Sequence, residues 1–128
     1  MHIDVIDTFD ALKGVHDAWN SVYDADPEAN FFLTYQWIDE WLDFNRGPWF
    51  VLAAKRTKDS ADYVAFLPLR MRAKYDKDVG LYNQVYFAGA QFSDYAGVLC
   101  RPEAEDDALR AFATHIKRKL SWAEFSLD

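Results

Sequence analysis

The stretch WFVLAAKRTKDSADYVAFLPLRMR, residues 49–72, decides the fold class of this chain. Trp49–Ala54 is a mainly apolar run, and Tyr63–Arg72 is a second run that ends in an alternation of apolar and polar residues. The segment Lys55–Asp62 between them is polar and rich in Lys, Asp and Ser. Two such runs joined by a short polar turn predict an antiparallel β-hairpin. Because Pro68 has no N–H to donate, we expect it at a bulge or at an unpaired position.

One short strand and two helices are predicted before this hairpin. Ile3–Ile6 is apolar and favours a strand, and Asp7 and Thr8 are residue types that cap a helix. The first helix is indicated by residues that recur at helical spacing, namely Leu12, Val15, His16, Trp19, Val22 and Tyr23. His16 falls on this apolar face and is interpreted as a hydrogen-bonded core histidine.

The second helix follows Phe31–Leu33, and Thr34 is its expected cap. Its apolar stripe consists of Trp37, Ile38, Trp41 and Leu42. Gly47 and Pro48 are expected to stop it, since glycine tolerates a left-handed exit and proline cannot continue a helix.

The residues after the hairpin predict a loop, two strands, a helix and a last strand. Lys74–Asp78 is charged and predicts the loop, whereas Leu81–Phe87 and Ala96–Leu99 favour strands. Pro102 suits the first turn of a helix, and that helix has acidic residues at its start and basic residues at its end. Trp122–Leu127 predicts the last strand. The expected fold is α/β (α+β), in the order β-α-α-β-β-β-α-β, in which the strand-like segments Leu81–Phe87 and Ala96–Leu99 count as one strand, with helices flanking a mixed sheet in one domain over residues 1–128.

The charge balance and the cysteine content exclude several classes of function. The net charge of −7 offers no basic footprint for nucleic acid or for an anionic membrane. Cys100, the single cysteine, lies in an apolar run and is expected to be a small buried hydrophobe. No stretch reads as a signal peptide or a membrane span, and no metal-ligand spacing is present, so a cytoplasmic protein without a metal is predicted.

The order of elements, together with a series of short motifs, resembles a known family. The motifs cover about residues 10–128 and are Trp19, the Phe31–Thr34 run with Trp37 and Trp41, Phe66–Leu69, Ser93–Gly97, and Pro102 before an acidic helix start. This series resembles the N-terminal half of CelD-related tandem acetyltransferases of the GNAT superfamily, distant relatives of the FemABX aminoacyltransferases. The resemblance implies a segment of a longer chain whose C-terminal GNAT domain, in cis, binds acetyl-CoA or another acyl-CoA.

The chain departs from the family at the expected cofactor loop. A GNAT site carries a Q/R-x-x-G-x-G/A loop, whose backbone N–H groups hold the pyrophosphate at a helix start. At the corresponding place, residues 100–107 read CRPEAEDD, with no glycine and with four carboxylates. We therefore expect no cofactor to bind in this segment, and we expect the segment alone to be inactive.

Three groups of residues are candidates for an acceptor site. Ser93, Asp94 and Tyr95 are polar residues between two apolar segments, and Asp94 is the weak candidate for orienting an amine or accepting its proton. The alternative is a turn in which Asp94 bonds its own backbone. Arg70, with Arg72, would hold an anionic group of a substrate, or else lies on an exposed face in surface ion pairs.

Tyr35 is the remaining candidate. With Trp37 and Trp41 it would form an aromatic wall for a sugar or an acyl chain, whereas a stripe of this kind is more often core. Tyr35 lies off the main stripe and is the member expected to be most exposed.

Three functions follow from these observations. The first is the acceptor-side domain of an N-acyltransferase, and the alternative is a stand-alone, non-catalytic interaction domain with a degenerate GNAT fold. A self-sufficient enzyme assembled as a homodimer is a third, and it predicts that the chain binds acetyl-CoA by itself. The last strand is also expected to leave an unpaired sheet edge, which favours dimers.

Overall fold

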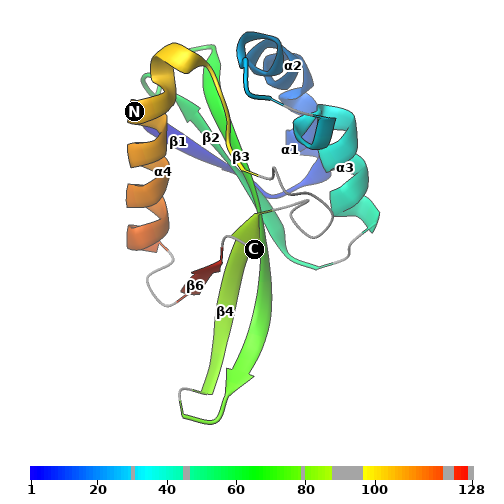
Figure 1. The fold of residues 1–128 in the computed structure, drawn as a ribbon, viewed down its shortest axis with the longest axis vertical. Helices are drawn as coiled ribbons and strands as arrows, with labels where there is room; N and C mark the ends of the chain where they lie inside the picture. Colours follow the sequence, from blue (N-terminus) through cyan, green and yellow to red (C-terminus); the bar gives the residue numbers. More distant parts are fainter. Residues whose placement is uncertain (30, 45–46, 79, 88–96, 120–122, 127–128) are drawn as a thin grey trace.

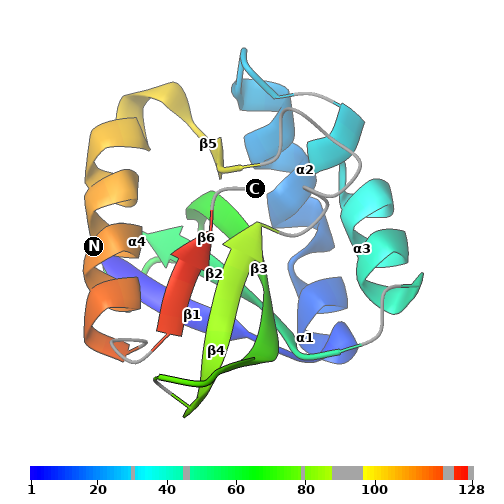
Figure 2. The same ribbon diagram turned by 60° about the horizontal axis from the view of Figure 1, so that its bottom comes forward.

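The computed structural model describes residues 1–29, 31–44, 47–78, 80–87, 97–119 and 123–126, without the side chains of residues 32, 72–76, 80–87, 119 and 123–126. It is a mixed α+β fold in three layers, with the helices α1, α2 and α3 on one face of a sheet and α4 on the other (Figures 1 and 2). The bounds of the helices are α1 Phe9–Gly14, α2 His16–Ala25, α3 Tyr35–Phe44 and α4 Glu105–Lys119, with 3-10 turns η1 Phe31–Leu33 and η3 Pro102–Ala104.

Four antiparallel strands form the body of the sheet. Their order is β1-β2-β3-β4, and β6 extends it by pairing in parallel with β4, while the short β5 pairs with β3. The β3–β4 hairpin projects beyond the helices (Figure 1). The bounds of the strands are β1 His2–Ile6, β2 Trp49–Lys55, β3 Tyr63–Asp76, β4 Gly80–Phe87, β5 Leu99–Cys100 and β6 Ala123–Ser126.

The two faces of β2 and β3 are both buried, which explains why these runs are apolar almost throughout. Alternation along β2 directs Val51 and Ala53 toward α1–α3, and Leu52 and Ala54 toward α4. The first cluster centres on Trp19, whose side chain is fully buried. The second consists largely of small and aliphatic residues, and its members are Phe50, Leu52, Ala54, Ala65, Leu67, Leu69, Cys100, Ala104, Ala108 and Phe112.

The central hairpin and both predicted threonine caps are confirmed. β2 and β3 pair antiparallel, with Leu52 opposite Leu67. The hydroxyl of Thr8 accepts a hydrogen bond from the backbone N–H of Ala11 at 3.1 Å, and that of Thr34 accepts from Trp37 at 3.3 Å. Short side-chain oxygens satisfy free N–H groups at both helix starts, as the sequence predicted.

The first predicted helix is two helices, and the interpretation of His16 as a core residue was wrong. The chain leaves helical geometry at Val15, where φ is −106° and ψ is 13°. A new helix then begins at His16, whose side chain is exposed while Trp19 and Val22 are buried. The apolar spacing continues across the break because both helices bury one side against the same sheet.

Pro68 lies at an unpaired position rather than at a bulge. It is opposite Val51 in the β2–β3 register, and the irregularity in that register is at Ala54 and Lys55. Met71 donates its N–H toward β2, to the carbonyl of Pro48, so alternation directs the ring nitrogen of Pro68 to the other edge of β3. Along that edge, within the described chain, the pairing of β3 with β5 ends at Phe66 and its pairing with β4 starts at Leu69, so Pro68 lies between the two.

The boundaries after the hairpin differ from the prediction. The charged loop predicted at Lys74–Asp78 was mostly wrong, because β3 continues to Asp76 and only the two residues after it form a turn. In the region of the strand predicted at Ala96–Leu99, β5 covers Leu99–Cys100, while Gly97 and Val98 are not part of a strand and Ala96 lies outside the described residues. Charged side chains do not oppose a strand in a hairpin that extends into solvent, so polarity alone misplaced this boundary.

Candidate functional site

Tyr35, at the start of α3, is half-buried rather than exposed. Its ring stacks on the imidazole of His16 with centroids 3.9 Å apart, and it contacts the edge of Trp19 at 6.3 Å. Burial, followed by the nearby charge of Asp39, raises the pKa of Tyr35. The phenol of Tyr35 therefore stays neutral and covers part of the core. Trp41, on the same helix, is buried, so the core alternative holds for that residue.

Arg70 is buried, with 8% of its surface exposed, which overturns the alternative of an exposed face with surface ion pairs. Its guanidinium carbon lies 5.3 Å from the centroid of the Trp41 ring, in cation–π geometry. Gly47 also lies against the guanidinium, and a Cβ at that position would collide with Nη2 of Arg70. Arg70 thus fastens the exit of α3 to the sheet.

The predicted acceptor residues are not all brought together. Tyr35 and Trp41 are six positions apart on α3, about 9 Å along its axis, and Arg70 contacts Trp41. Ser93, Asp94 and Tyr95 lie outside the described residues, as does the side chain of Arg72.

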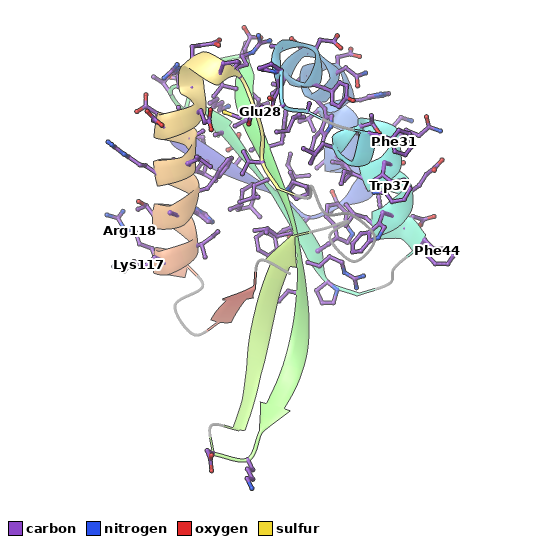
Figure 3. The ribbon with its side chains drawn as sticks, in the orientation of Figure 1. Glu28, Phe31, Trp37, Phe44, Lys117 and Arg118 are labelled. Carbon is purple, nitrogen blue, oxygen red and sulfur yellow. The ribbon has the colours of Figure 1, made fainter. Side chains whose placement is uncertain are left out.

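An acidic cleft of about 500 Å³ lies where the end of α2, η1, the segment 97–100 and the start of α4 meet. Three carboxylates line it, those of Asp26, Glu28 and Glu105. Figure 3 shows Glu28 in the space between the start of α4 and the helices of the opposite face. The apolar part of the wall is formed by Leu33, Val98 and Leu109.

Asp26 holds this cleft together and is committed to the backbone. One carboxylate oxygen accepts from the N–H of Glu28 at 2.9 Å, and the other accepts from the N–H of Cys100 at 3.0 Å. The second of these bonds joins residues that are 74 positions apart in the sequence. Because Asp26 is engaged in this way, Glu28 and Glu105, both exposed, are the carboxylates available to a ligand.

The electrostatic field of the cleft is negative. Burial, followed by the charges of Asp26, Glu105 and Glu103, raises the pKa of the Cys100 thiol to about 11. The sulfur donates to the carbonyl of Arg101 at 3.1 Å. A neutral, hydrogen-bonded thiol is a poor nucleophile, so this cleft can attract a cation but does not activate Cys100.

Sequence reasoning missed this cleft. Glu105 is one of the acidic residues that the sequence places at the start of a helix. The available signal was the acidic turn beside Pro27, but nothing local in the sequence places that turn against residues 97–105.

Two further features are absent from the described residues. Their histidine, cysteine and acidic side chains nowhere gather in a group of three that could hold a metal ion. None of the helices in the described ranges has the length and apolar character that a bilayer crossing requires. Comparison of the chain with protein-family models and with curated proteins finds no match.

Proposed function

We propose that this chain is the N-terminal, acceptor-side domain of a GNAT-type N-acyltransferase. The order of its elements supports this proposal, because helices precede the antiparallel β2–β3–β4 unit and α4 then connects β4 to the parallel β6. The acyl-CoA would be held by a C-terminal GNAT domain in cis. This segment then forms one wall of the acceptor pocket.

The acidic cleft is the observation that carries the proposal. An acceptor amine is a cation at neutral pH, and the exposed carboxylates of Glu28 and Glu105 would hold it by charge-assisted hydrogen bonds. The apolar wall would take the carbon chain that bears the amine. The cleft includes Gly97, which follows the candidate segment Ser93–Tyr95 by two positions in the sequence.

The chemistry asked of this segment is positioning. Direct transfer from a thioester needs the amine to be held in line and to lose a proton before it attacks. Asp94 is the proposed acceptor of that proton. The start of α4 is poorly suited to a pyrophosphate, because Ala104 donates its N–H to Arg101 and acidic residues surround it.

Titration of the chain with hexylamine tests this role. We expect amide shifts in nuclear magnetic resonance spectra to be confined to residues 26–28 and 97–105. Replacing both Glu28 and Glu105 by Gln should weaken binding by about threefold to tenfold, as expected for exposed charge pairs. Glu103→Gln removes the same kind of charge just outside the cleft and is the matched control. Equal weakening in the control, or shifts elsewhere, would count against the site.

The length of the native gene product tests the wider proposal. A native chain that continues past Asp128 and carries a Q/R-x-x-G-x-G/A loop supports the acyltransferase. Binding of acetyl-CoA by the 128-residue chain alone would instead favour the self-sufficient homodimer. Pairing along β6, the last strand in the described sheet, would give that dimer, and sedimentation measures it.

A stand-alone interaction domain is the second candidate, and exposed aromatic rings favour it. Phe31 is 63% exposed and its ring lies 5.6 Å from that of Trp37, while Phe44, at the end of α3, is 83% exposed; both lie on the outer side of the molecule (Figure 3). Large exposed rings are typical of protein interfaces. A native chain that ends at residue 128 and binds no amine would make this the better account.

A further inference from the structure

A second cleft, away from the acidic one, lies between β1 and the side of α4. Its volume is about 690 Å³, and the charged side chains from α4 that line it are Asp107, Arg110 and Arg118, together with His115. Asp107 is already paired, since one of its oxygens lies 3.1 Å from Nη1 of Arg56. In a chain of net charge −7, this is a local concentration of positive charge.

The two remaining arginines of this cleft are available to a ligand. Within the described residues neither Arg110 nor Arg118 makes an ion pair, and both are exposed. They are eight positions apart, about 12 Å along the helix, and Thr114 lies midway between them in the same cleft wall. Flexible arginine side chains on either side of a hydroxyl suit a phosphate, whose three oxygens can accept from all of them.

An apolar hollow continues from this cleft along β1. Its volume is about 640 Å³, and Val5, Trp49, Phe50 and Met71 form most of its wall. His115 borders both hollows. Ile3 lines the basic one and Val5 the apolar one, and these two residues share a face of β1 about 7 Å apart. The two hollows are therefore halves of one groove, with a cationic half and an apolar half.

We propose that this groove binds a free single-chain amphiphile with a phosphate head and an aliphatic tail. The head lies between Arg110, Thr114 and Arg118, and the tail lies over Val5 and Met71. Charge complementarity selects the head, and the half-exposed Val5 gains from being covered. This site is separate from the amine cleft, with which it shares no lining residue.

Calorimetry with three probes separates the two halves of the groove. Octyl phosphate, kept below its micelle concentration, is expected to bind with one-to-one stoichiometry. It should bind at least about tenfold more tightly than methyl phosphate, since burial of several methylenes adds to the affinity. Octyl glucoside has the same tail without a charge and should give no binding heat. Equal affinities of octyl and methyl phosphate, or tight binding of the glucoside, would overturn the proposal.

Matched variants locate the head. Arg118→Gln should weaken octyl phosphate about fivefold to tenfold through the loss of charged hydrogen bonds. Lys117→Gln is the control, because Lys117 carries the same charge on the neighbouring position of α4 (Figure 3) and lines a different hollow. It should change the affinity less than about twofold. An equal loss in both variants would mean diffuse attraction and would refute the site.

A further variant and a vesicle experiment complete the test. Val5→Thr keeps the shape of an exposed side chain but replaces a methyl group by a hydroxyl, so it should weaken octyl phosphate by about threefold and leave methyl phosphate unchanged. Vesicles of phosphatidylcholine with phosphatidic acid should leave the chain in the supernatant. Sedimentation of the chain with them would assign the groove to a membrane surface and contradict a free amphiphile.

Discussion

The two faces of the sheet are packed in different ways. On the face under α1, α2 and α3, Trp19 and Phe66 stack with centroids 4.7 Å apart, and the indole N–H of Trp19 donates to the carbonyl of Leu33 at 2.8 Å. On the face under α4, alanines make a large part of the contact between this helix and the sheet, and Ala65, Ala104 and Ala108 are completely buried. One face is filled by large rings, and the other is closed by bringing a helix near the sheet.

The difference teaches where this fold has room for ligands. Rings fill the space under three short helices that would not be stable alone, so little of that face is left open. Alanines let the single long helix α4 approach the sheet closely, and the spaces on either side of α4 remain open as clefts. Both proposed binding sites lie beside α4, which contributes Glu105 to one and Arg118 to the other.

The largest effect should follow from emptying the aromatic face. Trp19→Ala removes a fully buried ring that joins α2, η1 and β3, and it should lower the free energy of unfolding by about 3–5 kcal/mol. Urea denaturation followed by circular dichroism measures this loss. Trp19→Phe keeps most of the volume and gives up the bond to Leu33, so its loss should be clearly smaller. Equal losses would show that the hydrogen bond dominates over packing.

The alanine face should instead be sensitive to added volume. Ala108→Leu inserts three carbons where α4 meets the sheet, and we expect a loss of about 1–3 kcal/mol in the free energy of unfolding. Ala113→Leu makes the same change on an exposed position of the same helix and should be nearly neutral. If Ala108→Leu were tolerated as well, close approach of α4 would not be what closes this face.

Gly47, just after the end of α3, offers a test at the edge of the aromatic face. Gly47 has φ of 132° and no room for a Cβ beside Arg70, so Gly47→Ala should destabilise by about 1–2 kcal/mol. Gly14 ends α1 with open space around it, and Gly14→Ala should stabilise by about 0.5–1 kcal/mol. Thermal unfolding of the two variants should therefore shift in opposite directions. A shift in the same direction would refute the conformational account.

The smallest effect concerns Tyr63 and the carboxylate of Asp4 to which it is hydrogen-bonded. Burial, followed by the hydrogen bond that its hydroxyl donates to Asp4, raises the pKa of Tyr63 to about 12 from 10.0. Since the folded pKa exceeds the unfolded one, this residue stabilises the fold below about pH 10, and the contribution is lost as the pH rises through about 12. Tyr63→Phe should reduce the decline in unfolding free energy over this range. An unchanged decline would assign it to other groups.

The hydrogen bond between Tyr63 and Asp4 also affects stability at low pH, where its contribution is lost as the pH falls. The hydrogen bond from Tyr63 lowers the pKa of Asp4 below its usual value of 3.8. A carboxylate with a lowered folded pKa stabilises the fold above its unfolded pKa, and this contribution disappears as the pH falls through the folded value. In Tyr63→Phe the acid limb of the stability profile should therefore be shallower.

Local chemistry explains which parts of the fold could be predicted. The hairpin followed from two apolar runs and a polar turn, and the caps followed from Thr8 and Thr34, because such features depend on residues within one turn or one strand. His16 and Arg70 were misjudged because periodicity assigns a residue to a face without saying what covers that face. The break in the helix at Val15 leaves His16 exposed, and Gly47, just after α3, helps to bury Arg70.

The sequence by itself determined the mixed α+β class, the approximate elements, the buried Cys100 and the absence of a glycine loop at the start of α4, because each of these depends on neighbouring residues or on composition. Only the tertiary structure decided that Asp26 and Glu28 meet Glu105, and that Arg118 and Val5 border one groove. Those meetings join residues that are far apart in the chain. Their proximity results from the pairing of strands and the burial of two opposite sheet faces, which no local pattern encodes.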